Sequence, residues 1–418
     1  MNLEHKKLIN TFKNGIVPES HLDFILTGRD DEIRALKACF ENTQQGIGSI
    51  KFLTGPYGSG KTFLLNYAKK MALESNFVVC KIEIDSSLKF YNLKQFYYQV
   101  MHNLYVYNPQ HKKTSFENIF DLWVSKLRSE AYRHKASNEI AYVVAEVSKY
   151  NQSFARAFLS YIKSKIKNDA RNSELIVSWL TGESNIPFQL KEAFQIKGEV
   201  TPDNAMDFLK AFAHLIKLLG YNGLVILIDE MDYIMTERSD LRIKAYHNLR
   251  HLIDLTVTNA LPNTFMLFSG AEHLFLCPDK GIDTYEALAQ RLNYQNPYTS
   301  KLPLDLTKPV MSLAKLKFEM YDELSEKLTY IYKKVYALEL KITTSSLKNW
   351  VFLDFKEEGI PYQEVSIRAF ITKYIAFMDL IHQQPEAHMF SVDLYAFFNN
   401  KSLDFKSKAP NPLENKSF

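Results

Sequence analysis

The feature that most constrains the fold is a glycine-rich segment, Gly55-Pro56-Tyr57-Gly58-Ser59-Gly60-Lys61-Thr62. Its pattern, G-x-x-x-x-G-K-T, indicates a phosphate-binding loop when a strand precedes it and a helix follows it. The apolar run 50–54 is typical of a buried strand, and residues 63–68 are typical of the first turns of a helix. These flanks favour a phosphate-binding loop over the alternative, an unrelated glycine-rich turn.

The residue types in this segment indicate how it would bind a nucleotide. Gly55, Gly58 and Gly60 let the backbone curl so that successive N–H groups point at one phosphate chain. The helix that follows offers its N-terminus to the same anion. We expect Lys61 to reach the β- and γ-phosphates and the Thr62 hydroxyl to hold Mg²⁺. The predicted cofactors are therefore ATP and Mg²⁺.

A second motif follows the continuously apolar run 223–228, which is typical of a central strand in a parallel sheet. Asp229 and Glu230 come directly after this run, and carboxylates at the carboxyl end of such a strand face the ligand crevice. We expect Asp229 to bind the metal and Glu230 to polarise the attacking water. A structural acidic turn is the alternative, but the upstream phosphate loop favours ATP hydrolysis.

Composition narrows the class of protein. A chain of 418 residues can form two or three domains, and a net charge of +4 gives no argument for nucleic acid. Cys39, Cys80 and Cys277 lie far apart, which disfavours a disulfide framework or a zinc site. No signal peptide is recognisable, and no run approaches the roughly 18 apolar residues of a membrane span. We therefore expect a cytoplasmic protein without a membrane partner.

The order of the predicted elements indicates an α/β fold, a P-loop NTPase with a parallel sheet, and a separate helical part. We expect a nucleotide-binding domain over 1–304, interrupted by a long helical insertion at about 90–200. Amphipathic helices after residue 305 indicate an all-α lid over 305–400. A polar tail, 401–418, follows.

Several basic residues outside the two motifs have alternative interpretations. Arg291 is a candidate arginine finger, which would stabilise charge on the transferred phosphoryl group, and an exposed helix arginine is the alternative. Arg368, at the start of a lid helix, would close over the nucleotide phosphates or simply face solvent. A basic cluster in the insertion is either a solvated helix face or a nucleic-acid contact. Its members are Lys163, Lys165, Lys167 and Arg171.

The order of these motifs resembles AAA+ ATPases of the origin-recognition type, and more narrowly the BREX-system ATP-binding (BrxD-like) proteins of bacterial anti-phage islands. The resemblance covers roughly residues 15–385. It rests on the phosphate loop and on these segments: Gly15-Ile16-Val17-Pro18, Thr27-Gly28-Arg29-Asp30-Asp31-Glu32, Trp179-Leu180-Thr181-Gly182-Glu183, Ile228-Asp229-Glu230-Met231-Asp232, Phe268-Ser269-Gly270-Ala271-Glu272, Lys280 to Leu292, and Ser366-Ile367-Arg368-Ala369-Phe370.

The resemblance assigns further roles by residue. It implies that Arg29 lies near the adenine, with an ordinary capped helix as the alternative, and that Ser269 touches the water or the γ-phosphate, with a buried structural serine as the alternative. It also implies a homo-oligomer in which Arg291 acts on the neighbouring subunit and Arg368 acts within its own, or the reverse.

We therefore expect an ATPase, converting ATP and water to ADP and phosphate, in a prokaryotic anti-phage defence or DNA-processing system. Hydrolysis would drive assembly or remodelling of a DNA or protein complex, and the candidate partners are double-stranded DNA and a defence-operon protein such as a helicase. The alternative is a nucleotide-dependent switch or scaffold with negligible hydrolysis of its own that regulates a partner enzyme.

Overall fold

The computed structural model describes residues 2–108, 113–184, 188–194, 198–294, 305, 307–338 and 342–383. The predicted tail, 401–418, and the boundary predicted at 304 lie outside the described residues. The chain forms two compact units. The sheet unit comprises Asp30–Pro56 and Leu64–Leu313, and the helical unit comprises Met1–Arg29, Tyr57–Phe63 and Ala314–Phe418.

The described residues of the sheet unit form a six-stranded sheet, and among them only the pair β2 and β3 is antiparallel. The strand order is β3-β2-β4-β5-β1-β6. The strands are β1 (Ser49–Gly55), β2 (Val78–Glu83), β3 (Leu104–Tyr105), β4 (Leu224–Asp229), β5 (Thr264–Ala271) and β6 (Val310–Ser312). The four central parallel strands are almost entirely buried, as their continuous apolar sequences predict. The mixed α/β prediction is therefore confirmed.

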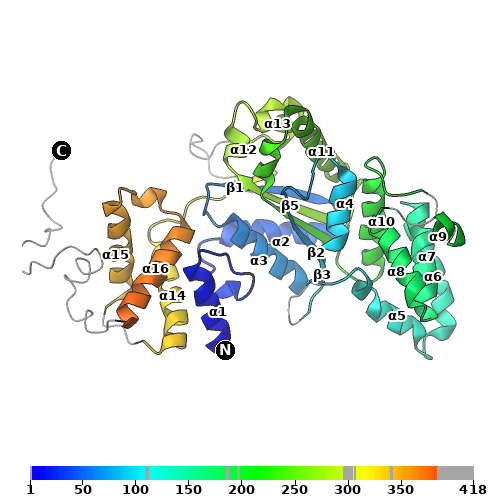
Figure 1. The fold of residues 1–418 in the computed structure, drawn as a ribbon, viewed down its shortest axis with the longest axis horizontal. Coiled ribbons are helices and arrows are strands. Elements are labelled where there is room, and N and C mark those ends of the chain that lie inside the picture. Colours follow the sequence, from blue (N-terminus) through cyan, green and yellow to red (C-terminus); the bar gives the residue numbers. More distant parts are fainter. Residues whose placement is uncertain are drawn as a thin grey trace, which may run out of the picture. The chain divides into compact units, whose positions relative to one another are not determined.

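Helices cover both faces of the sheet (Figure 1). One face packs against α2 (Asp30–Gln44) and the body of α3 (Lys61–Glu74). The other face packs against α4 (Leu93–His102), α11 (Ser239–Val257), α12 (His273–Leu276) and α13 (Glu286–Leu292). Side chains alternate along each strand, so Leu227 and Leu267 point toward the α2–α3 face, whereas Ile228 and Phe268 point toward the other.

A helical insertion lies between β2 and β4 and shares a continuous core with the second face of the sheet (Figure 1). After α4 it comprises α5 (Asp121–Arg128), α6 (Arg133–Ser148), α7 (Gln152–Ile166), α8 (Ala170–Leu180), α9 (Phe188–Ala193) and α10 (Ala205–Leu218). Its aromatic side chains pack against one another, as Phe120, Phe158 and Tyr161 do, and these three are fully buried. Burial of such large rings is a major source of stability for this insertion.

The helical unit has its own apolar core, to which four of the helices in its described part contribute. These are α1 (Asn2–Lys13), α14 (Met320–Tyr336), α15 (Thr344–Glu357) and α16 (Ile367–Gln383). The buried face of α1, with Leu8, Ile9 and Phe12, belongs to this core, although the sequence placed α1 in the nucleotide-binding domain. No described helix is both long enough and apolar enough to cross a bilayer.

Candidate functional site

The glycine-rich loop has the strand–loop–helix context that its pattern requires, because β1 ends at Gly55 and α3 begins at Lys61. Gly58 and Gly60 have φ angles of 75° and 96°, which side-chain-bearing residues adopt only with strain. A Cβ placed on Gly58 would also lie 2.6 Å from the Cβ of Ser366. Both the backbone angle and a close neighbour therefore require glycine at position 58.

Arg29 holds the phosphate loop through a hydrogen bond to its backbone. Its side chain is buried, and its guanidinium donates from Nη2 to the carbonyl of Ser59 and from Nη1 to the carbonyl of Ala314, each at 2.9 Å. Hydrogen bonds from a charged donor are stronger than neutral ones. The arginine predicted to lie near adenine therefore holds a carbonyl of the phosphate loop.

The polar side chains of the loop suit an anion. The Oγ of Ser59 is buried and has no hydrogen-bond partner among the described residues. A buried hydroxyl without a partner is costly, and a phosphate oxygen could accept from it. Lys61 presents its Nζ 5.4 Å from the centre of the exposed Tyr57 ring. The donors present therefore fit a nucleoside triphosphate.

The start of α16 lies beside the loop, in the same compact unit. Ser366 caps this helix, since its Oγ accepts a hydrogen bond from the N–H of Ala369 at 3.1 Å. The Cβ of Arg368 lies 3.8 Å from the position that a Cβ on Gly58 would take. The structure thus brings the predicted lid arginine, Arg368, next to the phosphate loop.

In the sheet unit, Asp229 and Glu230 end the central strand β4. Asp229 is only 3% exposed, and its Oδ1 accepts a hydrogen bond from the Glu230 N–H at 3.0 Å. Glu230 is exposed and has a left-handed backbone with φ 57°, a conformation that costs a non-glycine residue about 1–2 kcal/mol. Such strain persists where neighbouring structure imposes it, and it often marks a functional residue.

The segment after Glu230, the 3₁₀-helix η3 (Met231–Thr236), is held against the end of β5. The Oδ1 of Asp232 accepts a hydrogen bond from the Ala271 N–H at 2.7 Å. Gly270 allows this approach, because a Cβ there would lie 3.2 Å from the Cβ of Met231. These contacts fix the turn that presents Glu230. Sequence reasoning assigned no role to Asp232, although an aspartate three residues after Asp229 is a recognisable signal.

Ser269 lies next to Asp229 at this edge of the sheet. The register pairs Ile228 with Phe268, and Asp229 and Ser269 are the next residue on each strand. Because side chains alternate, both point toward the α2–α3 face. The Oγ of Ser269 is buried and has no hydrogen-bond partner in the described part of the chain. An available hydroxyl beside a buried carboxylate suits a bound ligand or its water.

Magnesium is implied by the chemistry of ATP, and the donors present fit it. The carboxylate of Asp229 and the hydroxyl of Thr62 are hard oxygen ligands, which Mg²⁺ prefers together with water and phosphate oxygens. Asp229, at the end of β4, and Thr62, at the start of α3, could each supply such an oxygen.

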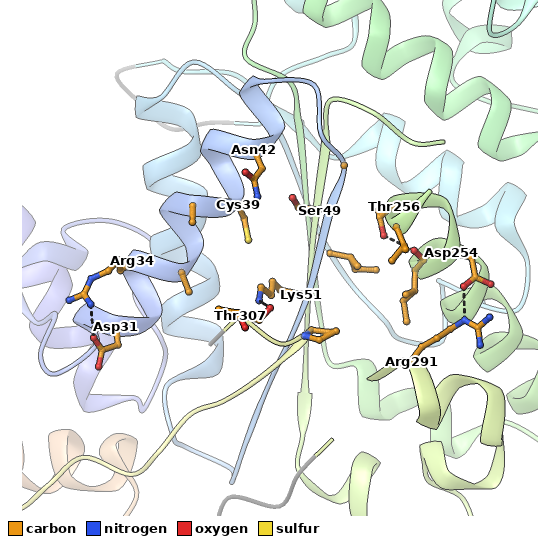
Figure 2. Close-up of a pocket in the computed structure, with 17 residues that line it drawn as sticks. Asp31, Arg34, Cys39, Asn42, Ser49, Lys51, Asp254, Thr256, Arg291 and Thr307 are labelled. Atoms are coloured by element: carbon orange, nitrogen blue, oxygen red, sulfur yellow. Dashed lines mark hydrogen bonds and ion pairs between the residues drawn. The ribbon is translucent and has the colours of Figure 1, made fainter. Parts of the chain in front are cut away.

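Arg291, the predicted finger, lies elsewhere in the sheet unit. It projects from α13 into a cavity of about 880 Å³ beside the amino-terminal half of β1 (Figure 2). Its Nε donates to Oδ1 of Asp254 at 2.5 Å, and its Nη1 donates to the carbonyl of Ala287 at 2.8 Å. The hydrogen bond from Arg291 holds the pKa of Asp254 below its ordinary value. In the single chain, Arg291 is thus held by its own subunit.

A family model described as BREX system ATP-binding protein BrxC/D matches residues 2–394. The chain belongs to this family. ATP binding and a place in the BREX anti-phage system are therefore supported at the level of the family. No curated protein matches the chain.

Proposed function

We propose that this chain is a Mg²⁺-dependent ATPase of the AAA+ type that acts in BREX anti-phage defence. The observation that carries the proposal is the pairing of two motifs on one parallel sheet. The phosphate loop leaves the carboxyl end of β1, and Asp229-Glu230 leaves the carboxyl end of β4, with only β5 between these strands. Ligands of open α/β sheets bind at this edge.

Each residue has a role that follows from its chemistry. Backbone N–H groups of the loop and Lys61 would bind the phosphates, with Arg29 holding the loop in shape. Magnesium, when bound, neutralises phosphate charge. Glu230 would accept a proton from the attacking water as the water oxygen bonds to the γ-phosphorus and the bond from that phosphorus to the bridging oxygen breaks, which releases ADP and phosphate. Ser269 would position that water.

The helical unit would act as the lid of such an enzyme. Arg368 lies beside the loop and would add positive charge next to the phosphates. Arg291 would serve a neighbouring subunit in a homo-oligomer, which requires it to exchange its hydrogen bond with Asp254 for a phosphate oxygen. Hydrolysis would then drive assembly or remodelling of a complex containing DNA or a partner such as a helicase.

The proposal is tested by comparing two variants in binding and turnover assays. Glu230→Gln should still bind Mg-ATP while its turnover falls by about 10²–10⁴-fold, the usual contribution of a general base. Lys61→Ala should lose ATP binding. Asp279→Asn, which removes an exposed carboxylate from a turn, is the matched control and should hydrolyse normally. Unchanged turnover in Glu230→Gln would remove Glu230 from its proposed role.

The second candidate function is a nucleotide-dependent switch with negligible hydrolysis. The observation that favours it is the hydrogen bond that keeps Arg291 engaged with Asp254 within its own chain. Mass photometry of Glu230→Gln with Mg-ATP, with and without double-stranded DNA, separates the two functions. A nucleotide-dependent oligomer supports the ATPase with a finger acting between subunits, and a monomer under both conditions supports the switch.

A further inference from the structure

The helical insertion carries a row of exposed basic side chains on α7. Arg156, Lys163 and Lys167 are seven and four residues apart, so they recur on one face of this helix and its cap. Arg171 is exposed on the first turn of α8, which packs against α7 (Figure 1). We call these four residues the basic stripe.

The basic stripe differs from two neighbouring cations, Lys165 and Arg128, because these two have partners. Lys165 forms an ion pair with Glu117 at 2.8 Å. Arg128 donates to the Lys165 carbonyl and, at 2.8 Å, to Oδ1 of Asn168. In the part of the chain that the structure describes, the four side chains of the basic stripe form no hydrogen bond or ion pair. Their charge is therefore available to an external anion.

The spacing of the side chains in the basic stripe is suited to a polyanion such as DNA. Arg156 and Lys167 are 11 residues apart, which corresponds to about 16 Å along a helix. Double-stranded DNA advances about 3.4 Å per base pair, so this length matches roughly five base pairs of phosphates. Single-stranded nucleic acid is instead bound on exposed aromatic rings. The three aromatic residues of α7 (Phe154, Phe158 and Tyr161) are fully buried, so this helix offers no ring on which a base could stack.

We propose that the basic stripe binds the phosphate backbone of double-stranded DNA without sequence preference. This inference gives the DNA partner of the proposed function a defined surface, but it does not depend on ATP hydrolysis. Contacts to phosphate position a protein on a duplex and carry no sequence information of their own. The helical insertion would thus hold the protein on DNA.

The test compares two full-length variants that lose the same charge. In the first, Arg156, Lys163, Lys167 and Arg171 are all replaced by Gln. In the second, four exposed basic residues elsewhere in the sheet unit, which likewise form no ion pair among the described residues, are replaced by Gln: Lys37, Lys135, Lys244 and Lys280. Binding to a fluorescent 30-base-pair duplex of random sequence is measured by anisotropy between 50 and 300 mM salt.

We expect the wild-type protein and the control variant to bind with a steep salt dependence. The stripe variant should bind at least about tenfold more weakly at 0.1 M salt, with a slope of log K against log [salt] reduced by up to about 3.6, since each phosphate contact contributes about 0.9. Circular dichroism and ATP hydrolysis without DNA should be unchanged in both variants, which separates this result from a failure of the proposed ATPase function.

Three outcomes would overturn the proposal. One is a wild-type protein that does not bind the duplex. Another is an equal loss of binding in both variants, which would indicate a response to net charge alone. The third is tighter binding of a single-stranded or RNA oligonucleotide of equal length, with the duplex unaffected by the stripe substitutions.

Discussion

Gly58 offers the sharpest test of how the phosphate loop is held. In Gly58→Ala the new Cβ has two separate costs. The left-handed backbone at φ 75° costs alanine about 1–2 kcal/mol. The Cβ also lies 2.6 Å from the Cβ of Ser366, and overpacking of this kind costs about 1–3 kcal/mol. Together they should destabilise the helical unit by about 2–5 kcal/mol.

Gly60→Ala is the matched control. Its backbone is also left-handed, at φ 96°, but the nearest atom to a new Cβ is the Cδ1 of Ile367, at 3.9 Å. Only the backbone cost of about 1–2 kcal/mol should therefore remain. Ser366→Gly removes the other half of the overlap, and a serine-to-glycine change at a helix cap costs only a few tenths of a kcal/mol. The double variant Gly58→Ala/Ser366→Gly should thus be about as stable as Gly60→Ala.

A local probe is needed, because a chain with two compact units need not unfold in one step. Trp350 packs against the core of the helical unit, whereas Trp123 and Trp179 belong to the core of the sheet unit. In 5-fluorotryptophan-labelled protein, the ¹⁹F signal of Trp350 during urea titration reports unfolding of the helical unit. Equal destabilisation by Gly58→Ala and Gly60→Ala, without rescue by Ser366→Gly, would refute the contact between loop and α16.

Three further predictions follow from the same geometry. Glu230→Gly should be about 1 kcal/mol more stable than Glu230→Ala in urea denaturation of the sheet unit, because glycine relieves the left-handed strain; equal stability would contradict that strain. Arg29→Lys should destabilise the helical unit by about 1.5–3 kcal/mol on the Trp350 signal, because lysine cannot donate to the Ser59 and Ala314 carbonyls together. In Arg291→Gln the pKa of Asp254 should rise toward its ordinary value, which a ¹³C titration of the carboxyl group measures. Because this pKa is depressed in the folded state, the ion pair of Arg291 and Asp254 stabilises the wild-type protein at neutral pH. This stabilisation is lost as the pH falls below about 4.

The sequence predicted the strands and the two motifs because these are local patterns. A continuous apolar run such as 223–228 determines a buried strand, and the carboxylates after it then lie at the ligand edge of the sheet. The sequence predicted a basic cluster in the insertion, but not which of its side chains form ion pairs. Lys165 is neutralised by Glu117, a residue 48 positions earlier in the chain, whereas Lys163 and Lys167 form no ion pair with any residue that the structure describes. The positions of these lysines in the sequence do not indicate which of them is paired, because the partner of Lys165 comes from a distant segment.

The features of the site that could not be predicted from the sequence depend on contacts between distant segments. No local signal predicts that Glu230 takes a left-handed backbone, because the segment that follows it is held by contacts with the distant end of β5. The engagement of Arg291 with Asp254 likewise depends on how α13 packs against α11. The roles of Arg291 as a finger and of Arg29 as an adenine contact remain predictions.

The shape of the phosphate loop depends on both ends of the chain. Arg29, 30 residues before it, holds the carbonyl of Ser59, and Ser366, some 300 residues after it, lies against Gly58. A loop held in this way loses less conformational freedom when it binds an anion, and this preorganisation strengthens binding. Both contacts lie in the helical unit, so unfolding of that unit would release them together. The affinity for ATP should therefore fall over the same range of urea concentration in which the Trp350 signal reports unfolding.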